Sequence, residues 1–286
     1  MLASPPVERC AGVVYADHDG VVLAGDLYLP AAGGGGGPFP ALVAVHGGGW
    51  QGGVRSAFQY WGPYLAARGT ALFAISYRLA KKGAKMFPQA VHDVLAAVQF
   101  VRGSAASFKI DPERIGLFGA SAGAHLAALA ALGGGSTFKG GYPQDAHAAV
   151  SSKVKALVGV YGVYDLVEMW QRYQLQSPRE NNIENFMGAA PMDDSRLYFD
   201  ASPINYATFA NNQMGVFLSV GTEDDLVNRR AQTDAFLMRL KQANFFVRTC
   251  IVAGAPHYWL NDPIEEPGSY SGFLAPPLLR FLGERL

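Results

Sequence analysis

The chain has 286 residues, of which 50% are hydrophobic, and its 23 lysines and arginines balance its 23 aspartates and glutamates. This length and apolar content suffice for one large α/β domain or two small ones. A chain of zero formal charge has no general electrostatic attraction to nucleic acid or to an anionic membrane, so we expect neither as a partner.

The two cysteines, Cys10 and Cys250, are not spaced as metal ligands, so no metal is expected; they are either free thiols or a bridged pair. The first ten residues lack the apolar region of a signal peptide. No apolar run reaches the roughly 18 residues that a membrane-spanning helix needs. We therefore expect a cytoplasmic protein, and nothing in the sequence indicates its oligomeric state.

Apolar runs along the chain alternate between lengths typical of strands and of helices. An N-terminal hairpin is expected from Val13–Tyr15 and Val21–Leu29, with its turn at Asp19-Gly20. Residues 111–113 are expected to begin a helix or a turn. Further strands are expected at residues 41–45, 71–75, 114–118, 154–161, 216–220 and 246–252, and helices at residues 58–68, from 88 onward, 122–132, 229–242 and 278–286. This alternation predicts an α/β fold with a mainly parallel sheet and helices on both faces.

The segment from residue 166 to residue 205 departs from this alternation. It is long, looks irregular, and is rich in Met, Trp, Tyr, Gln and Asn. Ligands of α/β sheets bind beyond the carboxyl ends of the strands, where this segment begins. We expect a small lid-like insertion over the site; an ordinary loop with a short helix is the alternative. No domain boundary is apparent, so residues 1–286 are predicted to form a single domain.

A run of glycines follows the predicted strand at residues 41–45, in His46-Gly47-Gly48-Gly49-Trp50. Glycines let the backbone approach a ligand closely and turn its N–H groups toward it. Such amides stabilise the negative charge that acyl transfer builds on a carbonyl oxygen. We predict Gly48, Gly49 and Ala122 as the donors of an oxyanion hole; a flexible loop without chemistry is the alternative.

A second motif, Gly119-Ala120-Ser121-Ala122-Gly123, lies between a strand-like run and an Ala-rich, helix-like run. A Gly-x-Ser-x-Gly sequence at a strand-to-helix junction is typical of a nucleophile elbow, which exposes the serine hydroxyl on a tight turn. This context predicts Ser121 as a nucleophile.

A serine hydroxyl needs a base within hydrogen-bond reach, and the base needs an acid to orient it. Among six histidines, His257 follows the last predicted strand and is our candidate base. His46 belongs to the glycine motif. His125 lies one turn after Ser121 on the same predicted helix and is expected to pack or cap. The others occupy a hairpin, a helix and a loop with no strand end nearby: His18, His92 and His147.

The acid is expected between Ser121 and His257 in the chain. Three neighbouring acids follow the predicted strand at residues 216–220, and we prefer Asp224, then Asp225, then Glu223. Asp165 also follows a strand and is a rival, although an acid there more often caps a helix or binds substrate.

Together these motifs resemble those of α/β-hydrolase-fold serine esterases, and most closely the hormone-sensitive-lipase-like carboxylesterases and bacterial acetyl or feruloyl esterases. The resemblance covers roughly residues 20–286. It implies Asp224 as the acid, three residues past Gly221. It also implies that residues 76–79 and 87–90 are scaffold, and that the protein hydrolyses small-molecule carboxylic esters through an acyl-enzyme without a cofactor. The stretch from 169 to 205 matches no family pattern, so the resemblance names no substrate.

Aromatic residues near the predicted site suit an apolar or aromatic acyl group, and Trp50, Trp170 and Tyr258 are expected to line its pocket. Packing into the core is the commoner fate of such residues. An amidase, formamidase or short peptidase would use the same triad. A lyase, or a non-catalytic ligand-binding protein on a hydrolase scaffold, is a more distant alternative.

Overall fold

The structure is a computed structural model that describes residues 7–31, 36–138, 140–177 and 181–286. The prediction about a signal peptide rests on the first ten residues, and residues 1–6 lie outside the described part. Among the described residues, none of the helices combines the length and the apolar character that crossing a bilayer requires.

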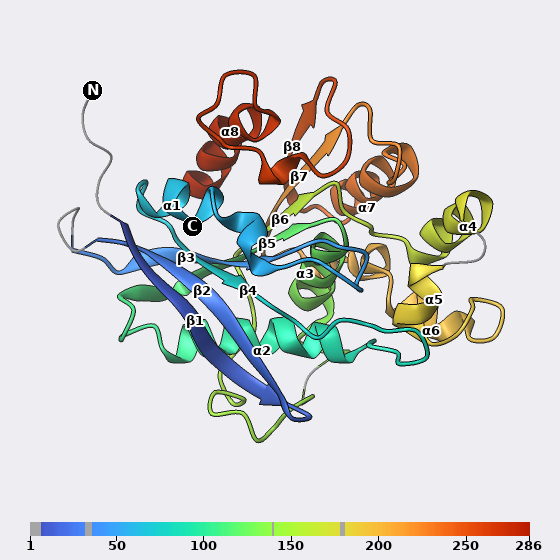
Figure 1. The fold of residues 1–286 in the computed structure, drawn as a ribbon, viewed down its shortest axis with the longest axis horizontal. Helices are drawn as coiled ribbons and strands as arrows, with labels where there is room; N and C mark the ends of the chain where they lie inside the picture. Colours follow the sequence, from blue (N-terminus) through green and yellow to red (C-terminus); the bar gives the residue numbers. More distant parts are fainter. Residues whose placement is uncertain (1–6, 32–35, 139, 178–180) are drawn as a thin grey trace.

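In the described part of the chain, eight strands form one sheet in the order β1-β2-β4-β3-β5-β6-β7-β8 (Figure 1). The strands β1 and β2 form an antiparallel hairpin, β2 pairs antiparallel with β4, and all other neighbours are parallel. The bounds are β1 (Val7–His18), β2 (Val21–Pro30), β3 (Phe39–Val45), β4 (Ala71–Ile75), β5 (Ile110–Ala120), β6 (Ala156–Val160), β7 (Gly215–Gly221) and β8 (Phe246–Val252).

Helices cover both faces of this sheet, as the sequence predicts. Along β3, Ala41, Val43 and Val45 pack into one apolar core and the alternating Leu42 and Ala44 into the other. The first core is covered by α2 (Gln89–Gly103), α3 (Ala122–Gly133) and α7 (Ala235–Gln242), and the second by α1 (Trp61–Ala66) and α8 (Tyr270–Arg285). In Figure 1, α1 and α8 lie above the strands and α2 lies below them. A parallel strand buried on both faces must be apolar at every position, which is why these runs are continuous.

Several boundaries differ from the sequence prediction. The helix expected at residues 58–68 is a 3₁₀ turn, Arg55–Phe58, followed by the short α1. Residues 111–113, expected to start a helix or turn, belong to β5, where they form a bulge between the pairs Phe39–Ile110 and Ala41–Ile115. The closing helix begins at Tyr270 instead of residue 278 and contains both Pro276 and Pro277.

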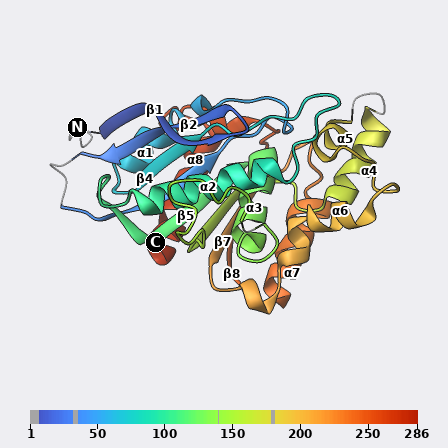
Figure 2. The same cartoon turned by 90° about the horizontal axis from the view of Figure 1, so that it is seen from below.

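The segment from 166 to 205, which looks irregular in the sequence, is mostly helical where it is described. It forms α4 (Leu166–Gln176), α5 (Asn182–Met187), α6 (Ser195–Asp200) and a 3₁₀ turn, Pro203–Tyr206. The side chains of Asp165, Asn181 and Asp194 accept hydrogen bonds from the first amides of the three helices. The Asp and Asn residues that make the segment look like a loop are therefore helix N-caps. Figures 1 and 2 show these helices grouped at one end of the molecule.

The cysteines lie on strands at opposite edges of the sheet: Cys10 on β1 and Cys250 on β8. Both are free thiols, which excludes the bridged pair that the sequence left open.

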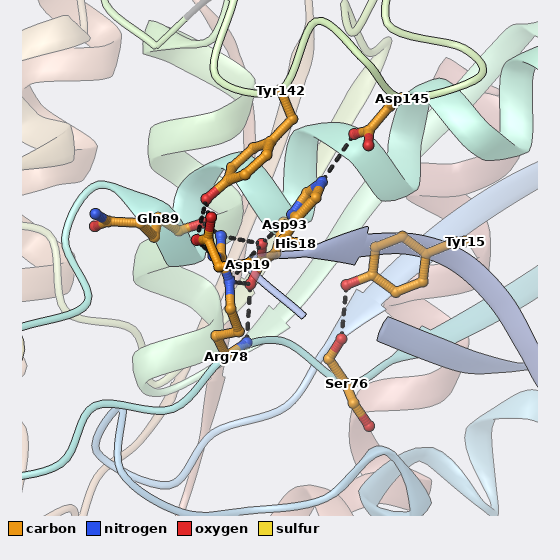
Figure 3. Close-up of polar contacts among 9 residues, drawn as sticks. All are labelled: Tyr15, His18, Asp19, Ser76, Arg78, Gln89, Asp93, Tyr142 and Asp145. Carbon is orange, nitrogen blue, oxygen red and sulfur yellow. Dashed lines mark hydrogen bonds and ion pairs between the residues drawn. The ribbon is translucent and has the colours of Figure 1, made fainter. Parts of the chain in front are cut away.

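A buried ionic network connects the end of the N-terminal hairpin to α2, to the residues after β4 and to the loop that contains Asp145 (Figure 3). At the end of β1, His18 Nδ1 lies 2.7 Å from the Asp93 carboxylate of α2, and its Nε2 lies 2.8 Å from Asp145. The guanidinium of Arg78, after β4, donates to the same Asp93, with Nε 3.0 Å from Oδ2. The ring of Tyr142 stacks on His18 at 3.6 Å. Each buried charge in this network therefore faces an opposite one.

The pKa of His18 reflects two opposing effects. Burial alone would lower it, but the hydrogen bonds and charges of Asp93 and Asp145 outweigh burial and raise it above its ordinary value. A histidine with a raised pKa stabilises the fold fully below its unfolded pKa, about 6.5, and this stabilisation is lost as the pH rises through the folded value.

We therefore predict that His18→Gln lowers the free energy of unfolding by about 3 kcal/mol at pH ~5.5, because it removes one partner of a buried charge pair. The loss should shrink as the pH rises above about 6.5 and through the raised pKa of His18 in the folded protein. Urea denaturation of both proteins across this range measures it. His147→Gln is the control, since that imidazole faces the hydroxyl of Ser104 and not a carboxylate. A destabilisation by His18→Gln that is equal at every pH would contradict the charged role of His18.

Candidate active site

The sharp turn between β5 and α3 holds Ser121 in a strained backbone conformation. Its φ is 53° and its ψ is −123°, a region that costs a non-glycine residue about 1–3 kcal/mol. The amide of Ser121 donates to the Val160 carbonyl of β6 at 2.9 Å, and its carbonyl accepts from Ala124 at 2.9 Å. These bonds fix the turn from the neighbouring strand and from the helix that follows.

The two glycines of the motif are required by the space around this turn. A Cβ on Gly123 would overlap the Val45 carbonyl of β3, and one on Gly119 would overlap the backbone of Gly123 and Ala124. Helix α3 can therefore lie this close to the sheet only with glycine at both positions. The structure thus gives the Gly-x-Ser-x-Gly motif the local geometry that the sequence predicts.

Two loops at the carboxyl ends of neighbouring strands bring an imidazole and a carboxylate to Ser121. Ser121 Oγ lies 3.0 Å from His257 Nε2, and His257 Nδ1 lies 2.8 Å from Asp224 Oδ2. Because a carboxylate only accepts hydrogen bonds, Nδ1 carries the proton and Nε2 accepts from the serine hydroxyl. The side chains of His257 and Asp224 are only 2% and 1% exposed, so water competes little for this pair.

The other carboxylate oxygen of Asp224 is also held, by the amides of Leu226 and Val227 at 3.1 and 2.8 Å. The other candidate acids make different contacts. The backbone carbonyl of Asp225 accepts from Arg172. The side chain of Asp165 caps α4 by accepting from the amides of Val167 and Glu168. Among the acids that the sequence left open, Asp224 is the one that meets His257.

The glycine loop after β3 supplies backbone amides beside Ser121. Gly48 and Gly49 have φ values of 121° and 58°, a region that favours glycine. Within the described residues, their amides donate to no protein acceptor. Ala122 is the first residue of α3, where helical amides have no intrahelical partner. All three residues line one pocket together with Ser121, which is the arrangement that an oxyanion hole requires.

Residues after β4 hold this loop at both ends. The Tyr77 hydroxyl donates to the His46 carbonyl at 3.0 Å, and the two rings stack at 4.5 Å. At the other end, the amide of Ala80 donates to the Trp50 carbonyl at 2.8 Å. Burial lowers the pKa of His46 below its ordinary value, which favours the neutral imidazole.

Two pockets meet at Ser121. The larger, of about 350 Å³, runs along the glycine loop and the 3₁₀ turn before α1, past Tyr161 and Leu260. The smaller, of about 190 Å³, is lined by Val163 and by residues of the 166–205 segment. Gly48, Ser121 and Tyr258 border both pockets, and the Tyr258 side chain is mostly exposed. A bound molecule could therefore extend to either side of the hydroxyl.

The three predicted pocket aromatics have different fates. Tyr258 borders both pockets, and Trp50 lines the smaller one while its indole is buried. Trp170 lines neither pocket, and its indole N–H donates to Glu184 of α5 at 2.7 Å. Tyr173 and Met169 line the smaller pocket in its place. Their i, i+4 spacing places both on one face of α4, a signal that requires the helix to be recognised first.

The described residues contain no group of three or more His, Cys, Asp and Glu side chains arranged to hold a metal ion. The site offers a serine hydroxyl hydrogen-bonded to a buried imidazole, a carboxylate bonded to the other ring nitrogen, and a set of backbone amides beside the hydroxyl. These are the parts needed for nucleophilic attack on a carbonyl carbon.

Comparisons with known proteins point the same way. A family model described as BD-FAE matches residues 25–240. Esterase LipQ of Mycobacterium tuberculosis is 31% identical over 71% of this chain and 46% of its own length. A probable isoprenylcysteine alpha-carbonyl methylesterase of Oryza sativa, ICMEL1, is 29% identical over 89% of this chain and 59% of its own length. The chain thus spans about half the length of the curated relatives it matches.

Among solved structures, an esterase of Thermogutta terrifontis with bound propionate superposes with a TM-score of 0.74 and 25% identity, covering 99% of this chain and 94% of that one. Esterase 2 of the same organism, phosphorylated by paraoxon, superposes with a TM-score of 0.73 at 25% identity, over 98% of this chain and 95% of that one.

The packing at the elbow leads to a prediction about stability. Gly123→Ala should lower the free energy of unfolding by about 3 kcal/mol, because the added Cβ would overlap the backbone of β3. Gly283→Ala is the matched control, since a Cβ at this helical glycine would meet open space. Urea denaturation of both variants measures the effect. Equal midpoints would contradict the steric overlap between a Cβ at residue 123 and the Val45 carbonyl.

Proposed function

Because the chain belongs to the BD-FAE family and has the α/β-hydrolase fold, we propose that it is a serine carboxylesterase acting on small or medium carboxylic esters through an acyl-enzyme. The observation that carries the proposal is the hydrogen-bonded series from Asp224 through His257 to Ser121. No metal or organic cofactor enters the proposed reaction. A cytoplasmic location stays a prediction from the sequence.

In the first half of the proposed reaction, Ser121 Oγ attacks the ester carbonyl carbon while His257 Nε2 takes the hydroxyl proton. Asp224 fixes the tautomer of the imidazole and stabilises the imidazolium. The carbonyl oxygen becomes an oxyanion that accepts from the amides of Gly48, Gly49 and Ala122. The intermediate then collapses, the bond from the carbonyl carbon to the alcohol oxygen breaks, and His257 donates its proton to the departing alkoxide. The alcohol is released, and the acyl group stays bonded to Ser121.

In the second half, water attacks the acyl-enzyme carbonyl and gives a proton to His257. The oxyanion forms again among the same amides, and its collapse releases the carboxylic acid as Ser121 takes the proton back. Losing one oxyanion donor typically costs about 3–4 kcal/mol of transition-state stabilisation. The buried surroundings strengthen these interactions, since few water molecules screen them.

The central prediction concerns the nucleophile. Ser121→Ala should lower kcat for a p-nitrophenyl ester by about 10⁴-fold or more, because no covalent intermediate can form. It should also abolish covalent labelling by an organophosphate, read by intact mass. Ser56→Ala is the control, since Ser56 lines the larger pocket without bonding to His257. Normal turnover by a folded Ser121→Ala protein would remove Ser121 from the mechanism.

Covalent labelling also separates the proposal from a non-catalytic scaffold, which would leave an organophosphate unreacted. An ester and amide pair that share one acyl group separates an esterase from an amidase. The proposed function requires the ester to be the better substrate by kcat/KM.

A second prediction concerns the acid. Asp224→Asn should lower kcat by about 10⁴-fold at neutral pH, because an amide facing Nδ1 favours the wrong imidazole tautomer. Asp225→Asn is the adjacent control and should change kcat by less than about twofold, since only its backbone carbonyl takes part in the structure's contacts to Arg172. The assignment of the acid fails if the larger loss follows the change at 225.

A further inference from the structure

His125 is a fully buried histidine that the proposed mechanism does not use. It lies on α3 one turn after Ser121, and its backbone amide donates to the Ser121 carbonyl at 3.1 Å. Burying an imidazole costs free energy unless both ring nitrogens have hydrogen-bond partners. An apolar residue of similar size would avoid that cost. The hydrogen-bond partners of the ring therefore indicate what a histidine does at this position.

Both ring nitrogens of His125 are engaged. The indole N–H of Trp50 lies 3.1 Å from Nδ1, and the carbonyl oxygen of Ala201 lies 2.8 Å from Nε2. An indole N–H can only donate and a carbonyl oxygen can only accept, so the proton must be on Nε2 and the lone pair on Nδ1. The surroundings therefore require one neutral tautomer. Burial also lowers the pKa of His125 to about 4, which keeps the ring neutral at ordinary pH.

These two bonds join three parts of the site. Trp50 directly follows Gly49 in the glycine loop, His125 belongs to the elbow helix, and Ala201 ends helix α6 of the 166–205 segment. Trp50 has a φ of 62°, which a bulky residue keeps only where its surroundings impose it. Its ring also stacks on Phe186 of α5 at 5.2 Å. The contacts to the indole thus hold the glycine loop in addition to the backbone bonds from Tyr77 and Ala80.

We propose that His125 is a positioning residue that holds the Gly48 and Gly49 amides in place through Trp50, and ties the glycine loop to the α4–α6 segment through Ala201. The inference rests on the proposed function, because these amides matter as donors to the oxyanion. It assigns His125 no contact with substrate and no proton transfer.

The expected kinetic effect follows from when the amides act. The oxyanion forms in the transition state, so a displaced loop weakens transition-state binding more than ground-state binding. Removing an oxyanion donor outright costs about 10²–10³ in kcat, and misplacing two donors should cost less. We expect His125→Leu to lower kcat about 10- to 100-fold, with KM within about threefold of wild type.

Two further variants separate hydrogen bonding from packing. Trp50→Phe keeps a ring against Phe186 and removes the indole N–H, so it should lower kcat to a similar extent. His125→Gln offers an acceptor and a donor as far apart as the two ring nitrogens, so it should recover most of the kcat that His125→Leu loses. In the double variant His125→Leu/Trp50→Phe, the two losses should not multiply, because both remove the same interaction.

The experiment measures kcat and KM for a p-nitrophenyl ester, with active sites counted by organophosphate titration so that only folded enzyme is compared. Urea midpoints are recorded for every variant, and His147→Gln is the control histidine on another part of the fold. Should His125→Leu fail to fold, Trp50→Phe and His125→Gln carry the test, and near-wild-type kcat in Trp50→Phe would then overturn the proposal.

Four results would each overturn the inference. The first two are wild-type kcat in folded His125→Leu and wild-type kcat in Trp50→Phe. The others are losses that multiply in the double variant and a kcat in His125→Gln as low as in His125→Leu. Each leaves the proposed function intact, provided that the wild-type protein hydrolyses the ester and Ser121→Ala does not. A wild-type protein without esterase activity would instead contradict the proposed function itself.

Discussion

The backbone of Ser121 is the constraint on which the rest of the site depends. Its positive φ lets the chain turn from β5 into α3 within one residue, so that the hydroxyl stands at the carboxyl edge of a parallel sheet. The turn survives its strain because β6 and α3 bond to it and because Gly119 and Gly123 let the helix approach the strands. In a parallel sheet the loops after β7 and β8 open at this same edge. They carry Asp224 and His257, so both side chains reach Ser121 from neighbouring strand ends.

Among the described residues, two buried histidines, His18 and His257, contact aspartates. Comparing them shows why only His257 has a chemical role in our proposal. Both ring nitrogens of His18 meet carboxylates, so the ring is held in a charge network and has no nitrogen left for a reacting group. His257 meets one carboxylate and keeps Nε2 for the serine hydroxyl. The number of acidic partners and the contact with the Ser121 hydroxyl therefore distinguish the structural histidine, His18, from the proposed base, His257.

The helical segment from 166 to 205 contributes to both the shape and the rigidity of the site. Met169 and Tyr173 of α4 line the smaller pocket. The end of α6 accepts the hydrogen bond of His125, which also accepts from the loop that carries the glycine amides. In our proposal, the helices that shape the smaller pocket therefore also help to position the amides that stabilise the oxyanion. A change in these helices would reach the reacting carbonyl through the imidazole of His125 and the indole of Trp50.

The sequence by itself determined the features that depend on neighbouring residues. Continuous apolar runs predicted the parallel strands. The glycines around Ser121 predicted the elbow, because the steric limits on a tight turn involve only adjacent positions. Only the tertiary structure decided that Asp224 and not Asp225 meets His257, that Trp170 donates to Glu184, and that three helices form within the 166–205 segment. Where a side chain points depends on which distant elements pack against it, and no local pattern contains that information.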